Sequence, residues 1–390
     1  MNMSRPIPYL GIIFGLVVGL VAVVLSNQFA AVPSAPSSPH SASSTVSVVS
    51  SSSPTGLPDL PFQSLPAATT SQKTTAPEKK PKLPVKPATS SSVVPSPAQI
   101  PAPATAPLPT FSSGNSALDA SATALRGSLV NIMCYAPAGS NIQSISGSGV
   151  FVDSKGIILT NAHVAQYFLL ADRGVDCIIR AGSPATSEYK AALVYISPAW
   201  IHANSTILTQ ATPVGTGEYD FALVAVTSGA TSAALPSSFP ALSLAKNPPL
   251  AGTPVVIASF AAQFLDTKQI QSALYPTVVF GSIKDVFTFG TNTIDELALG
   301  GSAAAQEGSS GGGIADGTGA LIGTITTSTI TGATDTRSLG AITASYIRSE
   351  YTRETGTSID ALLSEPTAVS VAEFVPKIPE LESILTAHLF

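Results

Sequence analysis

Short runs rich in Val, Ile, Leu and Thr recur between turn residues from residue 129 to residue 343. Runs of this length, bounded by Gly, Pro, Asn, Asp or Ser, are typical of β-strands. The expected strands are Leu129–Tyr135, Gly147–Val152, Gly156–Thr160, Asp176–Arg180, Ala191–Ser197, Phe221–Val226, Pro254–Ser259, Thr277–Val286, Ala320–Thr327 and Leu339–Thr343. They form two roughly equal groups, before and after residue 235, and so predict an all-β sandwich or barrel architecture.

The apolar residues after Thr343 follow a helical period instead of an alternating one. They are Tyr346, Ile347, Tyr351, Ile359, Leu362 and Leu363. We therefore expect a C-terminal helix that ends the globular domain, which spans residues 116–364. For the tail, residues 365–390, the pattern leaves the degree of order open.

The first 27 residues have the pattern of a membrane segment. Ile7 to Leu25 is apolar but for Pro8 and Tyr9, and it is long enough to cross ~30 Å of hydrocarbon. Arg5 is the only charge before it, which predicts a cytoplasmic N-terminus and an extracytoplasmic remainder. The expected localisation is a single-pass anchor in the cell membrane.

A cleaved signal peptide is the alternative, because it shares the charged start and the apolar stretch. The protein would then be secreted. We favour the uncleaved anchor, since the apolar run is long and Phe29 stands where a cleavage site needs a small residue.

Residues 28–115 are dominated by Pro, Ser, Ala and Thr. Such a composition cannot bury enough apolar surface to offset the entropy of ordering, so this linker is expected to be disordered. Residues 1–115 carry a net charge of +4 and the remainder carries −9, giving −5 in total. An acidic globular domain argues against nucleic-acid binding.

The stretch Gly308-Ser309-Ser310-Gly311-Gly312-Gly313 can be read in two ways. Gly/Ser runs are common in flexible linkers. Alternatively, the glycines let main-chain N–H groups converge beside an exposed serine hydroxyl, as in an oxyanion hole. Apolar residues on both sides, Ala303–Ala305 and Ala320–Ile325, place the stretch inside a folded sheet and favour the second interpretation.

A serine hydroxyl needs a base to become a good nucleophile. The chain has four histidines. His40 lies in the low-complexity segment and His388 is two residues from the end, so His163 and His202 are the candidates. Both precede Ser310, whereas the G-x-S-x-G elbow of α/β-hydrolases needs a histidine after the serine. We therefore reject the elbow.

His163 follows the apolar run Gly156–Thr160, and His202 lies in a polar region and is expected to be exposed. Asp220 opens the run Phe221–Val226, where its carboxylate should be partly buried. A buried carboxylate needs a hydrogen-bond partner, and an imidazole N–H is a natural one. A lone structural histidine and a turn-capping aspartate remain the alternatives when each residue is taken singly.

Taken together, Thr160-Asn161-Ala162-His163-Val164, Asp220-Phe221-Ala222-Leu223 and Gly308-Ser309-Ser310-Gly311-Gly312 resemble the trypsin-like serine proteases, and most closely the HtrA/DegP type of bacterial envelope proteases. The resemblance implies two six-stranded Greek-key β-barrels with the active site between them. It also implies His163 as general base, Asp220 as its orienting group and Ser310 as nucleophile.

The resemblance further implies an oxyanion hole formed by the N–H groups of Gly308 and Ser310. Ala304 would lie at the base of the specificity pocket, with Glu307 at its rim. A substrate backbone would pair with Thr326, Thr327 and Ser328. A pocket lined by methyl groups predicts cleavage after Val, Ala, Leu or similar residues, rather than after Lys or Arg.

The chain departs from the family at three places. Gly313 stands where proline usually follows, and Ser309 replaces the aspartate that pairs with a new amino terminus in trypsin. Too few residues follow the protease domain for the PDZ domain common in the HtrA type.

Cys134 and Cys177 each lie on an expected strand. From the residues alone a disulfide and two buried free thiols are both open, although an extracytoplasmic location permits the bond. The family resemblance implies the Cys134–Cys177 disulfide, because its first barrel places these strands side by side.

These inferences predict a membrane-tethered serine endopeptidase that hydrolyses unfolded or extended proteins. The partners are then protein and peptide substrates, with no metal and no cofactor expected. A catalytically silent protease-like domain that serves as a stalked binding module at the cell surface is the alternative.

Overall fold

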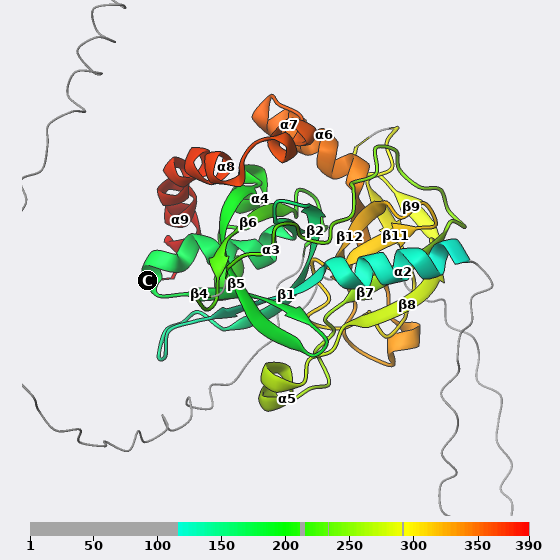
Figure 1. Ribbon diagram of the computed structural model, residues 1–390, viewed down its shortest axis with the longest axis horizontal. Coiled ribbons are helices and arrows are strands. Elements are labelled where there is room, and N and C mark those ends of the chain that lie inside the picture. Colours follow the sequence, from blue (N-terminus) through cyan, green and yellow to red (C-terminus); the bar gives the residue numbers. More distant parts are fainter. Residues whose placement is uncertain (1–115, 211–214, 233, 291, 390) are drawn as a thin grey trace, which may run out of the picture. The chain divides into compact units, whose positions relative to one another are not determined.

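The computed structural model describes residues 116–210, 215–232, 234–290 and 292–389 (Figure 1). The predicted membrane segment and linker lie outside these residues. Within the described part of the chain, no helix has the length and apolar character needed to cross a membrane.

The first half of the domain is a closed antiparallel barrel, as predicted. Its strands, in spatial order, are β1 (Leu129–Tyr135), β2 (Ile145–Asp153), β3 (Ile157–Thr160), β6 (Ala222–Gly229), β5 (Ala185–Ile196) and β4 (Asp176–Gly182). The barrel closes because β1 pairs with both β2 and β4. Each strand contributes buried Val, Ile or Leu side chains to the core, which explains the runs seen in the sequence.

The second half differs from the predicted second six-stranded barrel. It is a seven-stranded antiparallel sheet in the order β8 (Thr277–Ser282), β7 (Pro254–Ser259), β11 (Gly313–Asp316), β12 (Leu321–Ser328), β13 (Leu339–Thr343), β10 (Glu296–Ala298) and β9 (Asp285–Phe287).

The break in the run Thr277–Val286 explains this difference. Ile283 donates its N–H to Thr253 O at 3.0 Å, and Lys284 donates to Ala298 O at 2.7 Å. The first bond continues the pairing with the residue before β7, whereas the second begins the pairing with β10. The run therefore divides into β8 and β9, at opposite edges of the sheet. The short strands β10 and β11 were not predicted, because Glu-Leu-Ala and Gly-Ile-Ala-Asp are not runs rich in Val, Ile, Leu and Thr, unlike the equally short β3.

Helix α2 (Ser116–Ser128) precedes the first barrel and was also not predicted (Figure 1). Its Ser- and Ala-rich sequence resembles that of the linker before it. It buries Leu118 and Leu125, and Ser121 Oγ donates to Asp316 O at 2.7 Å, which attaches the helix to the end of β11.

The chain ends in helices. The predicted C-terminal helix forms as two, α6 (Ala344–Thr355) and α7 (Ile359–Ser364), because Gly356 ends α6 with a positive φ of 76°. The segment whose order was left open contains α8 (Thr367–Phe374), η4 (Val375–Lys377) and α9 (Ile378–Thr386). Helices α8 and α9 pack against the first barrel (Figure 1) through three buried side chains, Phe374, Leu381 and Leu385.

The remaining elements are short and lie in connections. They are α3 (Ala162–Ala165), η1 (Gln166–Arg173), α4 (Pro198–Ala203), η2 (Ile207–Thr209), α5 (Thr267–Ser272) and η3 (Thr334–Thr336).

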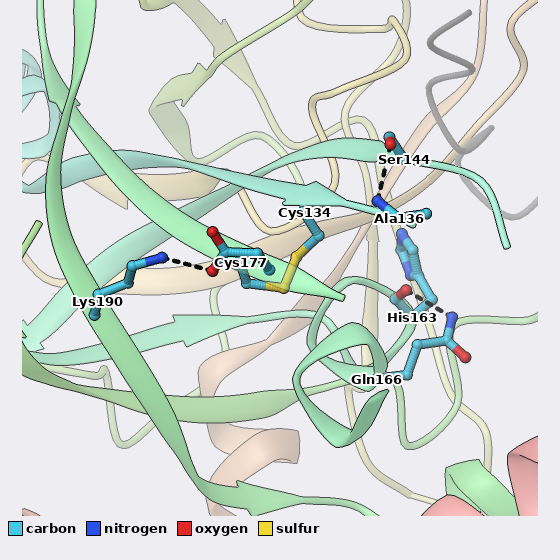
Figure 2. Close-up of a disulfide and its surroundings, with 8 residues drawn as sticks. Cys134, Ala136, Ser144, His163, Gln166, Cys177 and Lys190 are labelled. Atoms are coloured by element: carbon cyan, nitrogen blue, oxygen red, sulfur yellow. Dashed lines mark hydrogen bonds and ion pairs between the residues drawn. A yellow bond between two sulfur atoms is a disulfide. The ribbon is translucent and has the colours of Figure 1, made fainter. Parts of the chain in front are cut away.

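The predicted disulfide is present. Cys134 on β1 and Cys177 on β4 lie directly opposite each other in the barrel, with 4.0 Å between their Cα atoms (Figure 2). The two cysteines are separated by 43 positions in the sequence. Because the bond lowers the entropy of the unfolded chain, it should raise the free energy of unfolding by about 4 kcal/mol.

Candidate active site

His163 and Asp220 are held together by two contacts. His163 lies in the first turn of α3, three residues after the end of β3. Its main-chain N–H donates to Asp220 Oδ1 at 2.9 Å. The ring atom Nδ1 lies 2.6 Å from Asp220 Oδ2. Because the carboxylate can only accept, it favours the tautomer with a proton on Nδ1, which leaves Nε2 as a proton acceptor.

Asp220 is itself fixed by its neighbours. Tyr219 adopts a left-handed conformation with φ of 58° and donates its N–H to Tyr346 Oη at 3.1 Å. Asn161 Nδ2 donates to the Asp220 carbonyl at 2.9 Å and to Thr326 Oγ1 at 3.2 Å. Asn161 therefore ties the start of β6 to strand β12 of the second sheet.

Ser310 lies in a tight loop just before β11. Gly308 and Gly311 have positive φ angles of 86° and 85°. A Cβ on Gly311 would lie 2.0 Å from Ser148 O, so only glycine fits there. Gly311 also donates its N–H to Ile325 O at 2.9 Å, which joins the loop to β12.

The hydrogen bond expected between His163 Nε2 and Ser310 Oγ is not made in this structure. His163 Nε2 and Ser310 Oγ are both buried, and neither has a hydrogen-bond partner among the described residues. Catalytic hydrogen bonds are often long or misaligned without substrate. The structure thus brings His163 and Asp220 into contact and leaves the two reacting atoms without other partners.

Two main-chain donors accompany Ser310. In the described part of the chain, the N–H groups of Gly308 and Ser310 donate to no other residue. The carbonyl of the peptide before Gly308, Glu307 O, accepts from Ala262 N at 2.8 Å. Two uncommitted N–H groups beside a serine hydroxyl form an arrangement that can stabilise an oxyanion.

The predicted substrate-binding residues gather next to this loop. Ala304 is fully buried and Glu307 is half-buried. Strand β11 pairs with β12 only as far as Thr324, so Thr326–Ser328 continue beyond it while β13 pairs with their other side. The hydroxyl of Ser328 is buried without a partner among the described residues.

Sequence reasoning missed Arg337. Its buried guanidinium donates from Nη1 to Ala305 O at 2.7 Å and to Gln263 Oε1 at 2.6 Å. From Nε and Nη2 it donates to Gly332 O. The side chain thereby joins three loops around the residue next to Ala304. Its sequence context, in a polar loop, contains no signal of this role.

Glu296 was also missed. It lines a cavity of about 840 Å³ together with Thr327 and Arg337. Burial raises the pKa of Glu296 to about 7, against the opposing effect of a hydrogen bond to Thr327. A strand of three residues offers no pattern that would mark a partly buried carboxyl group.

His202 is exposed on α4, as predicted. In the described ranges there is no group of three or more His, Cys, Asp or Glu side chains that could hold a metal ion.

A closed antiparallel barrel lies beside a second antiparallel sheet, with a His–Asp pair on the first and a Gly-flanked serine on the second. This arrangement is similar to that of the chymotrypsin-like hydrolases. Residues 147–323 match the family model described as the trypsin-like peptidase domain. These residues are thus similar to trypsin-like peptidase domains, in agreement with the resemblance seen in the three motifs.

Solved structures give weaker similarity. One is Rv3671c from M. tuberculosis H37Rv as a serine-to-alanine mutant in an inactive form, with 19% identity, a TM-score of 0.38, and coverage of 65% of this chain and 97% of that chain. Another is the Rv3671c protease in an inactive form, with 20% identity, a TM-score of 0.39, and coverage of 62% and 93%. No curated protein matches the chain.

Proposed function

We propose that the protein is an extracytoplasmic serine endopeptidase, tethered to the cell membrane by residues 1–27, that hydrolyses unfolded or extended proteins in the manner of the HtrA type. The observation that carries the proposal is the doubly bonded His163–Asp220 pair. This pair supplies an oriented base, and the Gly308–Gly312 loop supplies a serine and two main-chain donors.

In the proposed reaction, Ser310 Oγ attacks the substrate carbonyl carbon while His163 Nε2 takes the hydroxyl proton. Asp220 stabilises the imidazolium that forms. The N–H groups of Gly308 and Ser310 bind the negative oxygen. His163 then gives the proton to the leaving amine, and a water repeats the sequence on the acyl-enzyme.

Labelling with a fluorophosphonate tests this function directly. We expect the wild-type protein to be labelled and the Ser310→Ala variant to remain unlabelled. Ser309→Ala is the matched control, because the adjacent serine is equally buried and its Oγ accepts a hydrogen bond from Ser259 Oγ at 3.0 Å. Unlabelled wild-type protein would support the alternative, a silent protease-like binding module.

The specificity pocket forms the second part of the proposal. Ala304 at its base and the adjacent Ala305 carry no charge, so burying a substrate lysine or arginine there would cost several kcal/mol. Small apolar side chains instead gain about 0.8 kcal/mol per buried methylene. We expect peptide-library profiling to show cleavage after Val, Ala or Leu; a preference for Lys or Arg would refute the pocket assignment.

A further inference from the structure

Ser148 lies on strand β2 of the first barrel and bonds to the loop Gly308–Gly312 before β11, here called the nucleophile loop. Its main-chain N–H donates to Ser310 O at 2.7 Å. Its hydroxyl donates to Gly308 O at 2.8 Å and accepts from Phe260 N at 2.8 Å. Its carbonyl accepts from Thr160 Oγ1 at 2.7 Å. The residue is fully buried, so no water competes for these bonds.

Gly308 needs such external support. With no side chain and a φ of 86°, glycine can rotate between conformations at little cost. The peptide before it is oriented by the bond from Ala262 N to Glu307 O, and the peptide after it by the bond from Ser148 Oγ to Gly308 O. Together these bonds determine where the N–H of Gly308 points.

We infer that the Ser148 hydroxyl is a positioning residue for the oxyanion hole: it holds Gly308 so that its N–H faces the oxygen of the tetrahedral intermediate. This inference rests on the proposed endopeptidase function and adds to it. Ser148 does not touch the substrate. Through its bonds to Gly308 O and Ser310 O, it holds the loop that carries Ser310 against the barrel that carries His163.

Removal of the hydroxyl leaves Gly308 O and Phe260 N buried without their partner. An unsatisfied buried polar group is costly, so the loop should rearrange to find other partners. Because the Gly308 N–H binds the oxyanion more strongly than the ground-state carbonyl, the rearrangement should affect the chemical step more than substrate binding.

The experiment compares Ser148→Ala with Ser146→Ala. Ser146 is a buried serine on the same strand and the same side of it, and its Oγ accepts from Asn131 Nδ2 at 2.9 Å, away from the nucleophile loop. The measurements are kcat and KM on a quenched peptide, inhibition by a peptide aldehyde, and binding of the corresponding product acid. The aldehyde forms a hemiacetal whose oxygen occupies the oxyanion hole, whereas the product acid depends less on it.

For Ser148→Ala we expect kcat to fall by about 10²- to 10³-fold and aldehyde affinity to fall by a similar factor, as when an oxyanion donor is lost. KM and product affinity should change by less than about threefold, and Ser146→Ala should leave all four values within that range. Ser148→Cys, which keeps the volume and a weak donor, should retain part of the activity and guards against failure of the alanine variant to fold.

Unchanged aldehyde affinity in a folded Ser148→Ala variant would overturn the inference, even if its thermal stability fell. Equal losses in Ser146→Ala and Ser148→Ala would also overturn it, because they would indicate a general packing effect. If the wild-type protein neither hydrolyses peptide nor binds the aldehyde, the proposed function fails first and the inference falls with it.

Discussion

Replacing His163 with alanine should lower kcat/KM for casein cleavage by about 10⁴- to 10⁶-fold in the soluble fragment that begins near residue 116. The variant loses the base whose ring is held by a buried carboxylate, with Nδ1 at 2.6 Å from Asp220 Oδ2. Without this base, the serine hydroxyl must attack at its unperturbed pKa, where it is a poor nucleophile. The residual rate would come from substrate binding and the oxyanion hole.

His202→Ala is the matched control, because His202 is exposed on α4. We expect it to retain wild-type activity. If His202→Ala were the damaging change and His163→Ala retained activity, the assignment of the base would be wrong. Thermal denaturation of both variants separates loss of chemistry from loss of fold.

The strands that could be predicted from the sequence are those formed by runs rich in Val, Ile, Leu and Thr. Leu129–Tyr135, Pro254–Ser259 and Leu339–Thr343 form with the expected bounds. Glu296–Ala298 and Gly313–Asp316 were missed because they are short and contain only one Leu or Ile each, whereas the equally short Ile157–Thr160 has three such residues. The long run Thr277–Val286 forms two strands, of which β8 pairs with β7 and β9 pairs with β10. The run itself contains no sign of this division, because it depends on hydrogen bonds to distant residues.

The candidate site shows a similar division. His163, Asp220 and Ser310 could be singled out because the chemistry of each residue type suits its local sequence. The network around them could not, because Ser148 and Arg337 act through contacts to residues 160 and 32 positions away in the chain, such as Gly308 and Ala305. No local pattern marks a buried serine or arginine that binds distant main-chain carbonyls.

The same distinction explains why the Cys134–Cys177 pairing needed more than spacing. Strands that are neighbours in space need not be neighbours in the chain, and β1 pairs with β4 across the closure of the barrel. The residues left the bond open, and the family resemblance implied it because that fold places the two strands side by side. The structure confirms this implication.

Asp220→Asn should lower kcat/KM by about 10⁴-fold while leaving the fold intact. An asparagine keeps the size of the side chain, and its carbonyl oxygen can still accept from the His163 main-chain N–H. The other terminal atom, which takes the place of Oδ2, becomes an NH₂ group that donates to Nδ1 instead of accepting from it. In the wild type, Asp220 orients His163 through two oxygens, at 2.9 Å and 2.6 Å. The asparagine would instead favour the tautomer with the proton on Nε2, and His163 would lose the acceptor that Ser310 needs.

Asp153→Asn provides the control for this change, since Asp153 Oδ1 accepts from the Lys155 main chain in a turn at the end of β2. We expect wild-type kcat/KM for Asp153→Asn, and melting temperatures for both variants within a few degrees of the wild type. Asp220 is buried, so a structural role alone predicts a lower melting temperature with activity preserved in the folded fraction. A folded Asp220→Asn protein with near wild-type kcat would show that the His163–Asp220 pair is structural and that the catalytic assignment is wrong.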